Sequence, residues 1–302
     1  MSFFDINRQL GSAHLIQNGV SIMDYSTSSF DLAGTLQQTL AKRYNLANDF
    51  ALNKIHECLS TEQISTHLED SGHWHDPLQT LGQPMIEQYY RFVGWLSEHL
   101  GFDFVFENNP LVRYHIPGRL DDRYRLADGE LFTHHSDTLL GDYFQQINMW
   151  LPFCDVKNTG ALSVCSKNTS IAALKQFASD QGYAYDQYKE SRVAFFDYAK
   201  QRPQLMADLR ADAMPTNLRY GQCLMFDPRV LHGTAENIEN TTRVSMDFRI
   251  VPLEDYQAII HELELQGKTP NSYEGDGLIK GEFYHALSAR EVAGTLTTAH
   301  QR

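Results

Sequence analysis

The segment from Arg243 to Ile250 alternates polar and apolar residues without a break, and it constrains the fold more than any other part of the sequence. A period of two is that of a β-strand, whose successive side chains point to opposite faces. One face carries Val244, Met246, Phe248 and Ile250, and the other carries Arg243, Ser245, Asp247 and Arg249. Four polar side chains are costly to bury on one strand face unless they pair or line a wet cavity. The pattern therefore predicts either the wall of a polar cavity or a solvated outer face with an arginine–aspartate pair.

Further strands are expected before this one. They are short segments, apolar or alternating and bounded by turn residues, at 111–116, 145–153, 161–165 and 222–226, while the alternating strand extends to 251. Helical spacing predicts helix over about 32–60, at 84–100 with Gly101 as a stop signal, over most of 170–209 and at 253–265. This order favours a mainly β fold with flanking helices, either a β-sandwich or a jelly roll.

The chain of 302 residues shows no internal repeat and no low-complexity linker, so we expect a single domain. Residues 1–109 are expected to form a mostly helical N-terminal part, and residues 110–251 a jelly-roll core with a helical insertion at about 170–210. Residues 252–302 are expected to form a helical tail. A hydrophobic fraction of 42% is enough for a sizeable core.

Charge and cysteine content limit the partners and the compartment. A net charge of −13 argues against nucleic acid as a partner, because nucleic-acid-binding proteins usually present a basic face. We find no run of about 18 apolar residues that predicts a membrane span, and no signal-peptide pattern at the N-terminus. The four cysteines form no C-x-x-C pair, which favours a reduced, cytoplasmic protein. We expect a small-molecule partner and a monomer or homodimer.

Potential metal ligands precede the alternating strand. His135 and Asp137 are two residues apart, so on an extended segment both side chains point the same way and can reach one metal. His232, from a later strand, could supply a third ligand. Two histidines and one carboxylate leave three open positions, which suits non-haem Fe(II). A chain with 13 histidines should contain roughly one H-x-D by chance, so the pair alone is weak, and zinc would accept the same ligands.

Together, the ligands and the strand resemble a known family. Arg243 stands eleven residues after His232, and Ser245 thirteen residues after it. With the H-x-D pair, this set is similar to the Fe(II)/2-oxoglutarate-dependent dioxygenases. The narrower likeness is to the phytanoyl-CoA dioxygenase-like branch and to streptomycin-type small-molecule hydroxylases of antibiotic pathways. The matching stretches are 133–137, 146–152, 232–233 and 243–249. The resemblance implies a double-stranded β-helix, a cupin-like jelly roll.

The resemblance also implies roles for individual residues. His135, Asp137 and His232 would bind Fe(II), and Arg243, helped by Ser245, would bind the distal carboxylate of 2-oxoglutarate. Lysine could not replace this arginine, because a planar guanidinium holds a carboxylate through two parallel hydrogen bonds.

Three residues of the segment 145–153 share one face, which in this family looks into the barrel. Asn148 would contact 2-oxoglutarate or the substrate, and Gln146 and Trp150 would contact the substrate. Relatives often carry an acid where Gln146 stands, so the role of Gln146 is open.

Basic residues near the entrance could bind an acidic or zwitterionic substrate. Arg113, His115 and Arg119 cluster before the metal motif, although pairing with nearby aspartates on a solvated face would explain them equally well. Arg249 is either a second carboxylate contact or a partner of Asp247, and we favour the partner role.

The reaction implied by the family consumes O2 and 2-oxoglutarate and releases succinate and CO2. Halogenating relatives lack the carboxylate ligand, so Asp137 favours hydroxylation of an unactivated C–H bond in a small polar metabolite or natural-product intermediate. The alternative is a jelly-roll protein that binds metal or a small molecule without turnover. A zinc hydrolase would have no use for Arg243 and Ser245.

The remaining histidines are interpreted as structural. His134 should point away from the metal and pack. The groups around His67, His73 and His75, and His261 in the tail, lack a third ligand at suitable spacing, and motif matches without context mostly mislead.

Overall fold

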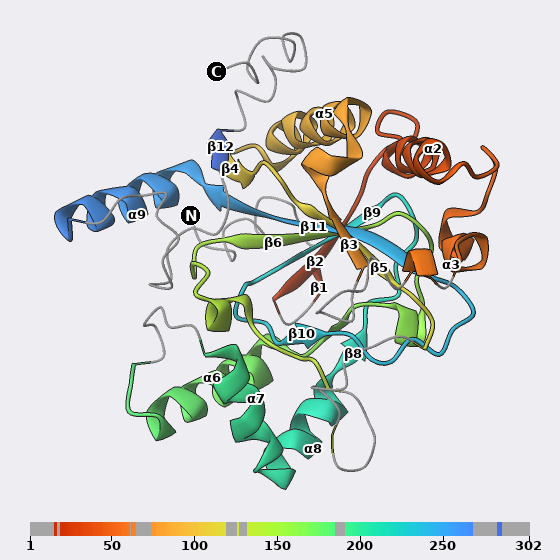
Figure 1. Ribbon diagram of the computed structural model, residues 1–302. Helices are drawn as coiled ribbons and strands as arrows, with labels where there is room; N and C mark the ends of the chain where they lie inside the picture. Colours follow the sequence, from red (N-terminus) through yellow and green to blue (C-terminus); the bar gives the residue numbers. More distant parts are fainter. Residues whose placement is uncertain are drawn as a thin grey trace.

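Two antiparallel β-sheets form the centre of the molecule (Figure 1). The computed structural model describes residues 15–16, 19–60, 62–64, 74–118, 126, 132–184, 191–267 and 283–285. The large sheet runs in the order β1-β2-β9-β6-β11-β4-β12, with β5 paired to β11 and β3 paired to β5. Its strands are β1 (Leu15–Ile16), β2 (Val20–Asp24), β3 (Trp74–Pro77), β4 (Phe104–Glu107), β5 (Leu111–His115), β6 (Ile147–Pro152), β9 (Gln222–Phe226), β11 (Arg243–Pro252) and β12 (Phe283–His285). The small sheet runs in the order β10-β7-β8, with β10 (His232–Gly233), β7 (Ser163–Val164) and β8 (Met214–Pro215).

The chain passes back and forth between these two sheets. From β5 in the large sheet it reaches His135, which pairs with His232 of β10 at the edge of the small sheet. It then enters β6 in the large sheet, followed by β7 and β8 in the small sheet. From there it returns to β9 in the large sheet, crosses to β10 in the small sheet and ends in β11 of the large sheet. This alternation is that of a double-stranded β-helix, so the predicted jelly roll with flanking helices is confirmed.

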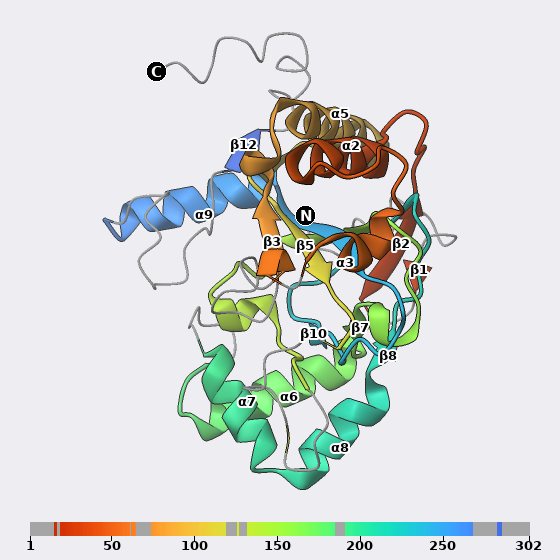
Figure 2. The ribbon, with the colours of Figure 1, turned by 45° about the vertical axis from the view of Figure 1, so that its right-hand side comes forward.

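Strand β11 separates the core from the space between the sheets. Its alternating apolar residues, at most 1% exposed, are Val244, Met246, Phe248 and Ile250. They pack with the apolar residues of β6 beneath two helices. The helices are α2 (Leu32–Tyr44) and α5 (Gln83–Leu100), which lie side by side over the large sheet (Figure 2). The ring of Phe248 meets that of Tyr89 from α5 edge to face, with centroids 5.2 Å apart. The polar side chains of β11 therefore point away from this core.

The helix predicted within 32–60 is in fact interrupted. α2 ends at Tyr44 because Asn45 adopts a left-handed conformation, with φ of 54°, and the chain turns out of the helix there. Two short elements follow, η2 (Leu52–Lys54) and α3 (Ile55–Cys58). In contrast, α5 ends at Gly101 with φ of 72°, where the stop signal was predicted.

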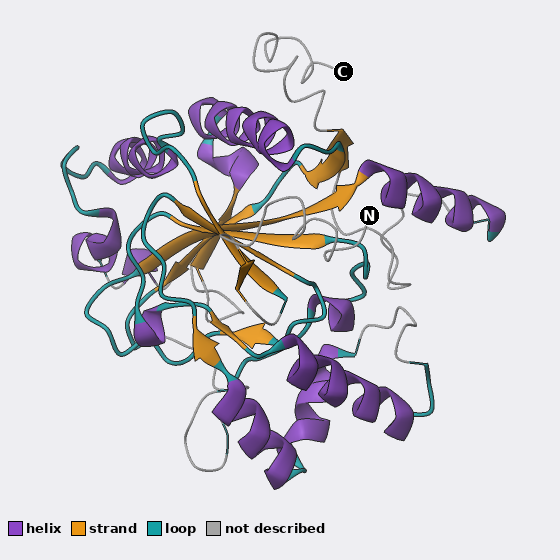
Figure 3. Cartoon of the chain, turned by 180° about the vertical axis from the view of Figure 1, so that it is seen from behind, coloured by secondary structure: helices purple, strands orange, loops and turns teal. Residues whose placement is uncertain are grey.

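Three helices lie on the far side of the small sheet, away from α2 and α5 (Figure 3). They are α6 (Lys167–Asp180), α7 (Arg192–Lys200) and α8 (Pro203–Asp212), within the stretch where a helical insertion is expected. Their apolar residues form a second cluster that includes Leu139 and Leu231, two positions that adjoin the predicted metal ligands. The insertion therefore supports the segments that carry those ligands.

Three short 3-10 helices and one longer α-helix complete the described chain. They are η3 (Leu78–Leu81), η5 (Asp137–Leu140), η6 (Asn158–Gly160) and α9 (Leu253–Leu265), the last as predicted and packed on β4 through Ile259 and Leu263. Within the described ranges, no helix is both long enough and apolar enough to span a membrane.

Gly233 gives a test of the small sheet. A Cβ at this position would lie 2.7 Å from Thr133 Oγ1 and 2.8 Å from the backbone nitrogen of His134, which is closer than real contacts allow. We therefore expect Gly233→Ala to lower the free energy of unfolding by about 1–3 kcal/mol in urea titrations. The control is Gly160→Ala, whose Cβ would meet its nearest atom at 3.6 Å, an ordinary contact, and which should leave the free energy of unfolding unchanged or raise it by up to about 1 kcal/mol. Equal effects of the two substitutions would contradict this packing.

Candidate metal centre and its pocket

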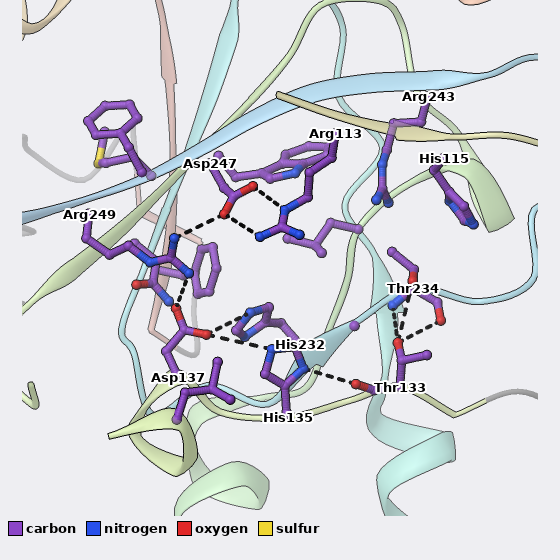
Figure 4. A pocket seen from close by; sticks show the side chains of 18 of the residues that line it. Arg113, His115, Thr133, His135, Asp137, His232, Thr234, Arg243, Asp247 and Arg249 are labelled. Carbon is purple, nitrogen blue, oxygen red and sulfur yellow. Dashed lines mark hydrogen bonds and ion pairs between the residues drawn. The ribbon is translucent and has the colours of Figure 1, made fainter. Parts of the chain in front are cut away.

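His135, Asp137 and His232 converge between the two sheets (Figure 4). Their potential ligand atoms all lie within 4.8 Å of one another. Asp137 Oδ1 is 3.4 Å from His232 Nε2 and 3.8 Å from His135 Nε2. The backbones of His135 and His232 exchange two hydrogen bonds, of 2.9 and 2.8 Å, which place the two rings side by side. Ser136 is extended, as the H-x-D argument requires, and Asp137 then begins η5.

Both histidine rings present a bare nitrogen to the centre. His135 Nδ1 lies 3.0 Å from the carbonyl oxygen of Thr133, and His232 Nδ1 lies 3.0 Å from that of Val230. A carbonyl can only accept, so each Nδ1 carries the proton and each Nε2 keeps its lone pair. Burial lowers the pKa of both rings, which keeps them neutral near pH 7. Metal-binding histidines are commonly oriented in this way.

Asp137 completes a negatively charged site. Burial alone would raise its pKa, but Arg249, together with His232 and Arg113, holds the pKa of the carboxyl below its ordinary value. Arg249 Nη2 donates to Asp137 Oδ2 at 3.2 Å, whereas Oδ1 is buried without a hydrogen-bond partner among the described residues. One carboxylate oxygen and two imidazole nitrogens, each with a free lone pair, face the same point and together form a donor set for a cation. The residues present therefore fit a bound divalent metal.

Arg243 offers the opposite charge to the same cavity. It is 6% exposed, and its Nε and Nη1 are buried without a hydrogen-bond partner in the part of the chain that is described. Burial lowers its pKa to about 10, so the guanidinium stays charged at neutral pH. It lies 5.8 Å from the centre of the Trp150 ring. A buried, unpaired guanidinium is costly, and an anionic ligand would remove that cost.

The three predicted residues around β6 occupy different places. Asn148 and Trp150 line the cavity, whereas Gln146 does not. Gln146 Nε2 donates to Asn148 Oδ1 at 2.9 Å and to Asp142 Oδ2 at 3.3 Å. The Nδ2 of Asn148 is left without a partner among the described residues. Gln146 therefore orients Asn148, and its predicted contact with substrate is not seen in the cavity lining.

Ser245 and the basic residues of β5 also differ from one another. Ser245 Oγ is fully buried without a hydrogen-bond partner in the described chain, and Ser245 is outside the cavity lining. Arg113 and His115 both line the cavity. Arg113 is committed to Asp247, with Nε to Oδ1 at 2.5 Å and Nη2 to Oδ2 at 3.2 Å. Arg119 lies outside the described residues.

The favoured role of Arg249 was too narrow. Arg249 does donate to Asp247 Oδ2, at 3.1 Å, but it also binds Asp137 and reaches two further carboxyl groups. The alternating pattern placed Arg249 on the correct face. It did not reveal the acids that approach from other segments.

The cavity that contains these groups has a volume of about 200 Å³. The polar face of β11 forms one wall through Arg243, Asp247 and Arg249, so the alternative of a solvated outer face is wrong.

Several residues of the site are not marked by any pattern in the sequence. Arg192, the first residue of α7, lines the cavity. Burial is the main cause of the lowered pKa of both ligand histidines, and the positive charge of Arg192 lowers each pKa further. Thr133 and Thr234 also line it, and Thr133 Oγ1 donates to the Thr234 carbonyl at 2.9 Å. No spacing pattern marked Arg192, because it comes from the insertion.

The histidines interpreted as structural fall elsewhere. His134 stacks on Phe132, with ring centroids 4.5 Å apart, and its Nε2 lies 3.0 Å from Ser163 Oγ. His75 is an exposed residue of β3 and His261 an exposed residue of α9. His67 and His73 lie outside the described residues.

Comparison with known proteins gives matches in structure only. No protein-family model matches the chain, and no curated protein matches it in sequence. Solved structures that align with it include the non-heme alpha ketoglutarate dependent epimerase SnoN from nogalamycin biosynthesis, 14% identical over 94% of this chain and 99% of that one, with a TM-score of 0.44. AviO1 from Streptomyces viridochromogenes is 12% identical over 82% and 96%, with a TM-score of 0.47. EctD from S. alaskensis, solved with 2-oxoglutarate and 5-hydroxyectoine, is 15% identical over 82% and 76%, with a TM-score of 0.45.

Glu107 gives a pH-dependent test of the buried acids. Burial, against the opposing charge of Arg249, raises the pKa of Glu107 from 4.5 to about 7. The unfolded chain therefore ionises first, and this group reduces stability as the pH rises from about 4.5 to 7. Relative to the unmodified protein, Glu107→Gln should gain on the order of 2–3 kcal/mol between pH 5 and pH 8, as measured by urea unfolding with chelator present. A stability difference that does not vary with pH would contradict the raised pKa.

Proposed function

We propose that the chain is an Fe(II)- and 2-oxoglutarate-dependent oxygenase that acts on a small molecule. One observation carries the proposal: the buried guanidinium of Arg243, with two nitrogens that lack a hydrogen-bond partner among the described residues, shares a cavity with the His–Asp–His cluster. The donor atoms of the cluster would bind a cation, and the guanidinium of Arg243 would bind an anion. A dicarboxylate that reaches both the metal and Arg243 satisfies the two demands together.

The donor set favours iron among the divalent metals. His135, Asp137 and His232 would hold it, and two histidines with one carboxylate leave three positions open for other ligands. Zinc could bind the same side chains, but a hydrolytic zinc site would leave the Arg243 guanidinium unexplained.

When bound, iron and 2-oxoglutarate supply the oxidation, in which O2 oxidises the co-substrate to succinate and CO2 and also oxidises the substrate. The protein holds and orients the reactants. Arg243 would bind the distal carboxylate through a bidentate contact, and the free Nδ2 of Asn148 would donate to co-substrate or substrate. Apolar residues such as Phe226 and Leu162 line the rest of the cavity and limit the entry of water.

We further propose hydroxylation of a small polar metabolite or natural-product intermediate. An acidic side chain, Asp137, occupies the position that halogenating relatives leave free for chloride. A cavity of about 200 Å³ accommodates a small substrate, and the charged wall of β11 suits a polar one. The net charge of −13 favours a small-molecule substrate over nucleic acid.

The first test is an anaerobic titration with Fe(II) and 2-oxoglutarate. The unmodified protein should develop a weak visible charge-transfer band, because the co-substrate chelates iron. His135→Ala should abolish the band, since it removes one of only three protein ligands. Lys200→Ala, an exposed change on α7, is the control and should leave it intact. Failure of the unmodified protein to bind iron and 2-oxoglutarate together would overturn the proposal.

The second test separates the two binding demands. Arg243→Ala should raise the 2-oxoglutarate concentration for half-saturation by about 10–100-fold, because it removes a charge-assisted bidentate contact. Iron affinity without co-substrate should change by less than about threefold, since the metal ligands are intact. Calorimetric titrations measure both quantities. Equal losses of iron and 2-oxoglutarate affinity would point to general disruption instead.

Turnover distinguishes an oxygenase from a binding or sensing protein. Succinate release should increase when the correct substrate is added, and a screen of amino acids, phosphonates, sugars and amines would locate the class. A product heavier by one oxygen atom would support hydroxylation over desaturation or cyclisation. Binding of iron and 2-oxoglutarate with no succinate release under any condition would favour the non-catalytic alternative.

A further inference from the structure

Arg249 sits among four carboxyl groups in the described chain, and Figure 4 shows two of them, those of Asp137 and Asp247. Its Nη2 donates to Asp137 Oδ2 at 3.2 Å. Its Nη1 donates to Asp247 Oδ2 at 3.1 Å and to Glu107 Oε2 at 3.4 Å. Its Nε lies 3.9 Å from Asp142 Oδ2. Each of the three nitrogens therefore faces a different direction, and only one of these directions leads to the metal ligands.

The acids on the other two sides fix the plane of the guanidinium. Asp247 is itself held by two hydrogen bonds from Arg113, and it lies on the same strand as Arg249. Glu107 comes from β4, which pairs with β11 directly beyond Arg249. A planar guanidinium with donors in a rigid fork can serve all these partners at once, whereas an ammonium group is a point charge on a flexible stem. Arg249 is therefore held in one orientation before any metal arrives.

This orientation determines which oxygen of Asp137 is left for a metal. Oδ2 is occupied by Arg249 Nη2, so the carboxylate cannot rotate freely about its last bond. Oδ1 is directed at the Nε2 atoms of His135 and His232 and has no hydrogen-bond partner among the described residues. Without Arg249, either oxygen or both could turn toward the cation.

We propose that Arg249 is the positioning residue of the metal centre, which restricts Asp137 to binding through a single oxygen. This inference rests on the proposed function, because it presumes that His135, Asp137 and His232 bind a divalent metal. It assigns to Arg249 a role in metal affinity and coordination that goes beyond an internal ion pair.

A merely structural role makes a different prediction. If Arg249 only neutralises buried acids, a substitution that keeps the positive charge should preserve the site. Arg249→Lys keeps the charge but loses the planar fork, so it separates the two roles. Arg249→Gln keeps a donor but loses the charge, and it is the more disruptive change because it leaves buried carboxylates without a counter-charge.

The experiment measures cobalt(II) binding to both variants and to the unmodified protein, without 2-oxoglutarate. Visible spectra report the coordination of cobalt, and competition with a chelator reports its affinity. The control is Arg219→Lys, because Arg219 is 67% exposed and pairs only with Asp24 in the described ion pairs. Thermal unfolding of the metal-free proteins shows whether each variant is folded.

We expect Arg249→Lys to fold and to lose about 10–100-fold in cobalt affinity, with a changed visible spectrum, while Arg219→Lys matches the unmodified protein. Arg249→Gln should lose at least as much affinity. If cobalt affinity and spectrum are unchanged in folded Arg249→Lys, the positioning role is overturned while the proposed function stands. If the unmodified protein binds no cobalt, the proposed function is overturned and this inference with it.

Discussion

The pleat of a single strand, β11, organises both the core and the site. Its even positions, from Val244 to Ile250, pack beneath α2 and α5, and its odd positions, from Arg243 to Arg249, face the space between the sheets. Because the side-chain period of a strand is two, a shift of one residue in register would exchange the two faces and bury the charges in the apolar core. The pairing of β11 with β5 and β6 therefore positions the site at the same time as it forms the fold.

Two of the three charges on that strand, Asp247 and Arg249, are paired with other charged side chains. Asp247 accepts hydrogen bonds from both Arg113 and Arg249. Arg249 also donates a hydrogen bond to Asp137. Two charged groups of the cavity lining keep buried atoms without a hydrogen-bond partner in the described chain: Asp137, at Oδ1, and Arg243, at Nε and Nη1. Buried polar groups are normally satisfied, and exceptions point to strain or to a missing ligand. Here the two exceptions have opposite charge and share one cavity, which is the physical basis for a metal with an anionic co-substrate.

Local patterns predicted the elements whose structure is decided locally. The β11 alternation, the α5 helix with its Gly101 stop and the α9 helix follow from periodicity and backbone conformation. The helix within 32–60 was predicted too long, because apolar spacing continued past Asn45 where the backbone turns left-handed. The parts of the site that come from distant segments were not predictable. Arg192 enters from the insertion, and Glu107 and Asp142 reach Arg249 from segments without a recognisable motif.

The central claim is that one cavity holds a metal at the His–Asp–His cluster and a carboxylate at Arg243. The most direct measurement is anomalous X-ray diffraction at the iron edge, from crystals grown without oxygen in the presence of Fe(II) and 2-oxoglutarate. We predict one strong peak bound to His135, Asp137 and His232, with 2-oxoglutarate density between that peak and the Arg243 guanidinium. Iron at another position, or a co-substrate that does not contact Arg243, would contradict the claim.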